Sequence, residues 1–220
     1  MNSSKTVRRW RIEIRFLFIV MAIVMLMTLI GCDRDKVAAD TQIAESTTSV
    51  ETTIEKGTSE LTVEEKAVVD LFQQGKYEAT ITKADAVLLR KPDSDIAYSV
   101  KGMALGLLGE PKKGLELAQK AYSLNEKNVS NYYNLAMLYK LQGQLDESAK
   151  WFRRVLDVEP HNTWSLYGLA TIYADEGHDA EALIWLKRAI ETDSTVKSVA
   201  REQDHFMRFH NNEKFKQLTQ

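Results

Sequence analysis

The cysteine and histidine residues are the side chains of this 220-residue sequence whose types could support nucleophilic or metal chemistry. The chain has one cysteine, Cys32, and four histidines, His161, His178, His205 and His210. The first two histidines fall in expected turns, and the last two are five residues apart, off a common helical face. The sequence has no HExxH or CxxC metal motif, no GxxxxGKS/T phosphate loop and no GxGxxG turn after a strand. It therefore predicts a protein that is not an enzyme and that binds neither a metal nor a cofactor.

The N-terminal segment has the pattern of a bacterial export signal. Residues 1–15 are cationic, and residues 16–30 form an apolar run with one polar residue. This run is shorter than the roughly 18–20 residues that a membrane-spanning helix prefers. It ends in Leu29-Ile30-Gly31-Cys32, which resembles a lipobox, the motif whose cysteine is lipidated and then begins the mature chain. We expect residues 1–31 to be a lipoprotein signal peptide and Cys32 to carry the lipid. The alternative is an uncleaved signal-anchor helix with an incidental cysteine.

Residues 32–60 differ in composition from the rest of the chain. Of residues 33–60, nine are serine or threonine, seven are acidic and none is aromatic. Such a segment cannot bury enough apolar surface to offset the entropy that it would lose on ordering. We expect a disordered tether with an r.m.s. reach of roughly 30 Å, which would hold a folded domain away from the lipid headgroups.

A period of 34 residues organises the remaining chain. Gly75, Gly109, Gly143 and Gly177 follow one another at intervals of 34 residues. Apolar residues on either side of these glycines recur at three- and four-residue spacing, which predicts a helix before each glycine and a helix after it. The sequence thus predicts four helix–turn–helix units, at residues 61–94, 95–128, 129–162 and 163–196.

These units resemble the tetratricopeptide repeat family, whose repeats have 34 residues and two helices. The unit 129–162 matches the family pattern at Tyr132, Leu135, Ala136, Tyr139, Gly143, Ser148, Phe152 and Pro160, and the unit 163–196 matches it at Leu166, Leu169, Ala170, Tyr173, Gly177, Ala182 and Ala189. The resemblance implies an all-α fold, an α-solenoid of four such hairpins over residues 61–196. Residues 197–220 are strongly polar with scattered apolar side chains, and we expect them to form a C-terminal capping helix over the last repeat.

The resemblance also implies a concave face that is lined by the first helix of each repeat. The groove-facing places of the family are occupied here mainly by apolar and aromatic side chains: Ile96, Met103, Tyr133, Met137, Lys140, Leu141, Trp164 and Tyr167. Aromatic and methionine side chains are enriched where proteins bind partners, which favours a peptide-binding groove. The alternative is that these side chains pack between adjacent repeats.

Charge and organisation together favour a binding function at a membrane. Without its first 32 residues, the chain has 24 basic and 30 acidic side chains, a net charge of −6, which argues against a nucleic-acid partner. We expect a lipid-anchored adaptor on the extracytoplasmic side of a bacterial cell membrane, with a protein or peptide as its ligand. Two alternatives are a structural subunit that forms a homodimer through the same face, and a substrate-recruiting arm of an envelope enzyme.

The lipoprotein hypothesis predicts that Cys32→Ser abolishes both lipidation and removal of the signal peptide, because the cysteine sulfur is the atom that accepts the lipid. Metabolic labelling with a radioactive fatty acid measures this, with the unsubstituted protein as control. A Cys32→Ser protein that still incorporates the label would contradict the hypothesis.

Overall fold

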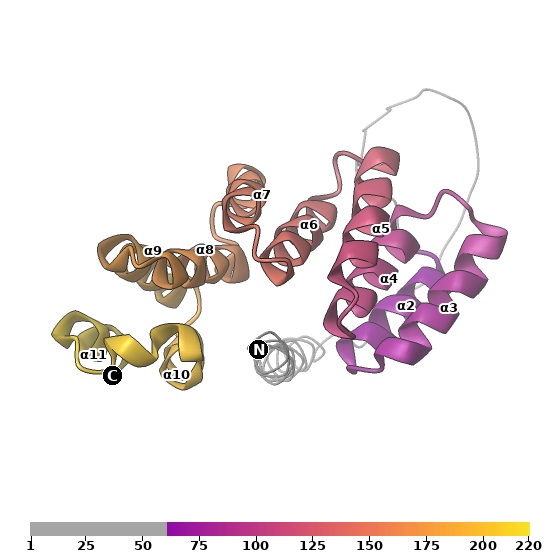
Figure 1. The fold of residues 1–220 in the computed structure, drawn as a ribbon. Helices are drawn as coiled ribbons and strands as arrows, with labels where there is room; N and C mark the ends of the chain where they lie inside the picture. The colour runs from indigo at the N-terminus through magenta and orange to yellow at the C-terminus, as the bar shows by residue number, and fades with distance from the viewer. Residues whose placement is uncertain (1–60) are drawn as a thin grey trace, which may run out of the picture.

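The computed structural model describes residues 61–220, and within this range all regular secondary structure is helical (Figure 1). The elements are α2 (Val63–Gln73), α3 (Tyr77–Arg90), α4 (Asp95–Leu107), α5 (Pro111–Leu124), α6 (Val129–Leu141), α7 (Leu145–Val158), α8 (Thr163–Glu176), α9 (Asp179–Thr192), α10 (Val196–Glu202), the 3-10 helix η1 (Asp204–Phe209) and α11 (Glu213–Thr219). The all-α fold and the solenoid of helical hairpins are confirmed. The expected signal peptide and tether, residues 1–31 and 32–60, lie outside the described residues.

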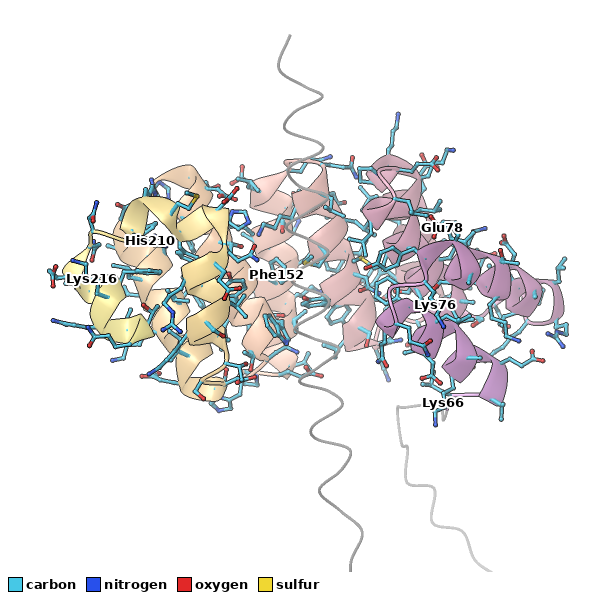
Figure 2. All side chains as sticks on the ribbon, turned by 90° about the horizontal axis from the view of Figure 1, so that it is seen from below. Lys66, Lys76, Glu78, Phe152, His210 and Lys216 are labelled. Atoms are coloured by element: carbon cyan, nitrogen blue, oxygen red, sulfur yellow. The ribbon has the colours of Figure 1, made fainter. Side chains whose placement is uncertain are left out.

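The helices from α2 to α9 pack as consecutive pairs, and each pair also packs against the next one. Figure 1 shows the pairs stacked into an arch, with α7 on its outer side and α10 and α11 turned back beneath α8 and α9. Figure 2 shows Phe152 in the middle of this array, between Lys66 in the first pair and Lys216 near the C-terminal end. None of the described helices is both long and apolar enough to span a membrane.

The first helix of each pair begins at a side chain that caps it. The capping residues are Thr62, Ser94, Asn128 and Asn162, and each side-chain oxygen accepts a hydrogen bond from a backbone N–H of the first turn. This bond satisfies one of the donors that a helix leaves unpaired at its start. The residues that precede α3, α5, α7 and α9 make no such bond. The side-chain caps therefore mark the starts of the repeats and not the turns within them.

The turn inside each repeat depends on its glycine. Gly75, Gly109, Gly143 and Gly177 have φ values of 72°, 94°, 74° and 84°, in the left-handed region that strains any residue with a Cβ. After each glycine, the next N–H donates to a carbonyl five residues earlier, as Gln144 does to Tyr139 at 3.0 Å. This pattern ends the first helix with its carbonyls satisfied and reverses the chain into the second helix.

Small residues allow the paired helices to pack closely. Gly102 of α4 and Gly114 of α5 face each other, and a Cβ built on Gly102 would lie 2.6 Å from the carbonyl oxygen of Gly114. Ala136 and Ala170, which lie one and two repeats beyond Gly102, are both fully buried. One continuous hydrophobic core runs from Tyr77 to Phe215, and a smaller cluster around Val68 fills the first repeat.

The C-terminal segment differs from the single capping helix that we expected over residues 197–220. It forms three short elements, α10, η1 and α11, because the chain turns to an extended conformation at Gln203, with φ −87° and ψ 135°. Phe206, Phe209 and Phe215 are each at most 2% exposed, and their ring centroids lie 5.7–6.1 Å apart. The break brings three rings into one small core over the last repeat, as capping requires.

Glu65 is a buried carboxylate that joins the first repeat to the second. One oxygen accepts hydrogen bonds from Ser94 Oγ at 2.5 Å and Lys91 Nζ at 2.9 Å. The other accepts from the backbone N–H and the hydroxyl of Thr62, at 3.1 and 2.9 Å, which completes a capping box at the start of α2. Burial alone would raise the pKa of Glu65, but the hydrogen bonds from Ser94, Lys91 and Thr62 outweigh it and lower the pKa to about 2.

The lowered pKa of Glu65 predicts a loss of stability in acid. A carboxyl whose pKa falls from 4.5 to about 2 on folding stabilises the folded state above pH 4.5, and this contribution disappears as the pH falls towards 2. The contribution is about 3 kcal/mol when fully developed. Glu65→Gln should therefore lower the free energy of unfolding at neutral pH and flatten its dependence on pH below 4.5. Urea denaturation at a series of pH values, followed by circular dichroism, measures both effects.

Glu64→Gln is the matched control, because Glu64 is the neighbouring carboxylate and pairs with Arg90 at 2.7 Å while 40% exposed. Exposed ion pairs contribute little to stability, so this variant should keep the pH dependence of the unsubstituted protein. Equal pH dependence in the Glu65→Gln and Glu64→Gln variants would show that Glu65 does not have the role assigned to it.

Candidate binding surface

The structure divides the eight predicted groove residues into two groups. Met103, Met137, Lys140 and Tyr167 are buried, with at most 8% of their surface exposed. Ile96, Tyr133, Leu141 and Trp164 are partly exposed. The first group packs within the array and offers little surface to a ligand. Half of the predicted groove is thus interior, which is the alternative that the sequence left open.

Tyr133 is tied to the core through Phe152. The two rings meet edge to face with centroids 5.7 Å apart, and Phe152 is fully buried. Burial raises the pKa of the Tyr133 hydroxyl. Phe152 also lies against α8, where a Cβ built on Gly168 would be 2.6 Å from the ring. Tyr133 therefore supports Phe152, the ring against which the fourth repeat packs.

Lys140 connects α6 to α8 from inside the array. Its ammonium group donates a hydrogen bond to the hydroxyl of Thr171, which is also buried. Thr171 in turn donates to the carbonyl of Gly168 at 2.8 Å, within α8. A lysine that is only 8% exposed and held in this way positions two helices and does not reach out to a ligand.

The C-terminal segment covers part of the face that we expected a peptide to occupy. The ring of Phe206 in η1 lies 5.9 Å from that of Tyr167 in α8. His205 Nδ1 is 2.6 Å from Asp175 Oδ1, and Arg208 donates to the carbonyl of Ala174 at 2.6 Å. The last turn of α8 is therefore occupied by the protein's own chain.

His205 stands at the centre of this contact. Burial lowers the pKa of His205, and the positive charge of Lys140 lowers it further, while the hydrogen bond with Asp175 acts in the opposite direction. The sequence showed the aromatic side chains of the C-terminal segment but not their target, because the contacts join residues about 30 positions apart. Among residues 61–220, no cluster of three or more histidine, cysteine, aspartate or glutamate residues could hold a metal ion.

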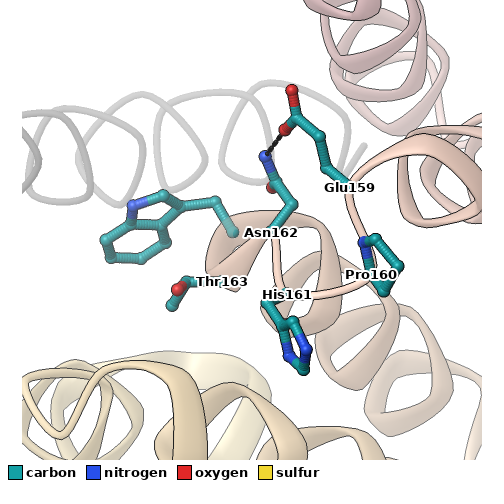
Figure 3. Close-up of a pocket in the computed structure, with 6 residues that line it drawn as sticks. Glu159, Pro160, His161, Asn162 and Thr163 are labelled. Carbon is teal, nitrogen blue, oxygen red and sulfur yellow. Dashed lines mark hydrogen bonds between the residues drawn. The ribbon is translucent and has the colours of Figure 1, made fainter.

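An open hollow remains at the start of α8, as Figure 3 shows. Its volume is about 510 Å3, and its lining consists of consecutive residues: Glu159, Pro160, His161, Asn162, Thr163 and Trp164. Asn162 shapes the polar side, since its amide donates to Glu159 at 2.8 Å and its oxygen accepts from the N–H of Ser165 at 3.0 Å. Trp164 provides the apolar side, and its ring stands edge to face on that of Tyr167, 5.9 Å away.

This hollow combines a partly exposed indole with carboxylate, imidazole and amide groups. An aromatic platform with a polar rim can bind an apolar side chain of a peptide and hydrogen-bond its backbone. Of the eight predicted groove residues, Trp164 alone lines the hollow. The other lining residues were missed because the sequence showed them only as the turn before a helix.

Comparison with known proteins identifies the repeats. Residues 128–194 match the tetratricopeptide repeat family. A TPR repeat-containing protein of Methanocaldococcus jannaschii is 31% identical over 91 residues, which are 41% of this chain and 15% of that protein. An uncharacterized protein of the same organism is 34% identical over 64 residues, which are 29% of this chain and 74% of that protein. The match thus spans about one seventh of the first relative and three quarters of the second.

Two solved structures have the same fold at low sequence identity. The Pseudomonas aeruginosa pilF structure has a TM-score of 0.60 at 17% identity, over 70% of this chain and 71% of that one. The structure of YrrB, called a TPR protein with an unusual peptide-binding site, has a TM-score of 0.52 at 17% identity, over 70% of this chain and 80% of that one. At these identities, the likeness shows the fold alone.

The contact between Gly168 and Phe152 predicts that Gly168→Ala destabilises the array. Alanine normally favours a helix over glycine by about 1 kcal/mol, but here its Cβ would meet the Phe152 ring at 2.6 Å. Overpacking of this kind costs about 1–3 kcal/mol. Thermal and urea denaturation should show the loss.

A double-mutant cycle with Phe152→Leu provides the control. If the ring causes the strain, Gly168→Ala should destabilise the Phe152→Leu background less than the unsubstituted protein, since the two residues are in contact. Strictly additive changes in the free energy of unfolding would contradict this explanation.

Proposed function

We propose that this chain, a member of the tetratricopeptide repeat family, is an adaptor without catalytic activity that binds a segment of a partner protein on the inner side of its helical array. The hollow beside Trp164 carries this proposal, because it combines a partly exposed aromatic ring with the exposed side chains of Glu159 and His161. Ile96 and Leu141, which are partly exposed, extend the apolar surface along the inner helices. The peptide-binding site named for YrrB supports the proposal by analogy of fold.

The proposal includes attachment to a membrane. The apolar run that ends in Cys32 supports lipidation of this cysteine, and the composition of residues 33–60 supports a flexible connection to the repeats. The repeat domain would then work on the extracytoplasmic side of a bacterial cell membrane, within reach of other envelope proteins. Both segments lie outside the described residues, so support for this part comes from the sequence.

The hollow predicts that Trp164→Ala weakens partner binding but preserves the fold. Truncation of an aromatic anchor typically costs about 2 kcal/mol of binding free energy, which is about thirtyfold in affinity. Tyr133→Ala should instead lower the melting temperature, because it removes a ring that packs on Phe152. Recovery of partners from detergent-solubilised membranes, together with the melting temperature, measures both effects.

Leu89→Ala is a suitable control, since Leu89 is an apolar side chain that is 86% exposed on α3, away from both α7 and α9. It should change neither partner recovery nor melting temperature, and Trp164→Phe should retain part of the binding. A Trp164→Ala protein that melts normally and recovers the same partners would overturn the assignment of the binding site to the hollow beside Trp164. If light scattering shows a dimer that Trp164→Ala dissociates, the face serves self-association instead.

A further inference from the structure

Three arginines on the outer helices of the last two repeats are held against aromatic rings. Arg154 of α7 lies 5.2, 5.0 and 4.9 Å from the ring centroids of Tyr122, Tyr132 and Trp151. It also donates to the Tyr122 hydroxyl at 3.0 Å. The three rings contact one another at centroid distances of 5.1–6.0 Å, so they form a single aromatic support beneath one guanidinium.

The other two arginines, Arg188 and Arg153, also place their guanidinium groups against aromatic rings. Arg188 of α9 is one repeat beyond Arg154, and its guanidinium lies 4.4 Å from the ring of Trp185. Arg153 donates to the hydroxyl of Tyr173 at 2.5 Å and lies 6.0 Å from its ring. Interactions of a cation with a ring face stabilise the position of each side chain. We call Arg153, Arg154 and Arg188, with their supporting rings, the arginine face.

No carboxylate of residues 61–220 lies within salt-bridge distance of these three guanidinium groups. Other cations nearby are paired. Lys150 contacts Glu147 at 3.4 Å on α7, and Lys187 contacts Glu191 at 3.7 Å on α9. The same helices thus pair their lysines with carboxylates and leave their arginines on aromatic rings.

A guanidinium held against an aromatic ring retains most of its capacity to bind an anion. The group carries five N–H donors in one plane, and the hydrogen bonds to the tyrosine hydroxyls use one donor of Arg153 and one of Arg154. Arg154 donates one hydrogen bond, to the Tyr122 hydroxyl, and its other N–H donors suit the two oxygens of a carboxylate. Because the ring fixes the side chain in advance, less conformational entropy is lost when the anion binds.

The acidic side chains near the three arginines favour a ligand with separate carboxylates over a ligand with a continuous anionic surface. α7 carries Asp146, Glu147 and Asp157 as well as Lys150, Arg153 and Arg154, so its formal charge is zero. A phosphate polymer or an anionic membrane would bring negative charge close to these acids and be repelled. A peptide can place single carboxylates at the arginines and avoid the acids. Ile184, which is 60% exposed, and the partly exposed indoles of Trp151 and Trp185 add apolar contact surface.

We propose that the arginine face binds a peptide segment in which acidic and apolar residues alternate. Its three arginines lie on α7 and α9, the second helices of the third and fourth repeats (Figure 1), and none of its residues lines the hollow beside Trp164. The protein would then hold two partner segments at once, which extends the adaptor function proposed above. The two sites are tested independently, because different side chains form them.

The test uses a fluorescent synthetic peptide of alternating glutamate and leucine, with fluorescence anisotropy as the readout. The protein should bind this peptide at low salt, and added salt should weaken the binding. A peptide with glutamine in place of glutamate should bind at least about tenfold more weakly, since it offers no charge to the guanidinium groups. Equal binding of the two peptides would overturn the proposal.

Single substitutions test which residues bind the glutamate peptide. Arg154→Lys keeps the charge but loses the planar group, and should weaken binding of the glutamate peptide about tenfold. Arg188→Gln should weaken it as well, which provides a second test if Arg154→Lys lowers the melting temperature. Lys112→Gln is the control, because it removes an exposed charge of α5 that is outside the arginine face. If Lys112→Gln weakens binding as much as Arg188→Gln, the attraction is one of general charge and the proposal fails.

Two further measurements separate this proposal from others. Trp164→Ala should leave binding of the glutamate peptide unchanged, so that failure of the inner site and failure of the arginine face are distinguishable. Vesicles of anionic phosphatidylglycerol should bind no better than vesicles of neutral phosphatidylcholine. Preferential binding of the anionic vesicles, lost in Arg188→Gln, would overturn the proposal by identifying a lipid-binding surface.

Discussion

Stacking of each helical hairpin on the next is the interaction on which the rest of this structure depends. A single hairpin cannot bury its apolar faces alone, and the continuous core shows that each pair completes its neighbours. Close packing of neighbouring hairpins needs small residues at the contact points, as at Gly106 of α4, where a Cβ would lie 2.5 Å from the Leu138 side chain of α6. The ring of Phe152 lies between the third and fourth repeats, against Gly168.

The stacking of the hairpins also decides which side chains of the inner helices remain accessible to a ligand. Met137 and Tyr167 occupy positions that would face a ligand, but they are buried within the array. Lys140 hydrogen-bonds across to α8, and a lysine held in this way is part of the scaffold. Exposed aromatic surface on the inner face of α8 persists at Trp164, because it lies in the first turn, away from the end that η1 covers.

The two ends of the array are closed in different ways. Glu65 ties α2 to the turn that precedes α4 through charged hydrogen bonds, so the first repeat relies on a buried polar network. At the other end, three phenylalanines form a small core, and His205 and Arg208 attach it to α8. The hydrogen bonds of Glu65 fasten the first repeat to the second, whereas the C-terminal segment covers the face that the last repeat would otherwise expose.

The sequence by itself determined the period, the fold class and the positions of the turns. These depend on local backbone geometry: Gly143 permits a left-handed turn, and Asn162 caps the helix that follows it, through bonds that span a few residues. Only the tertiary structure decided which groove residues are buried, that the C-terminal cap has three elements, and that Arg154 rests on three rings. These outcomes depend on contacts between residues about 30 positions apart, such as Arg154 with Tyr122, whose geometry is set by how one hairpin packs on the next.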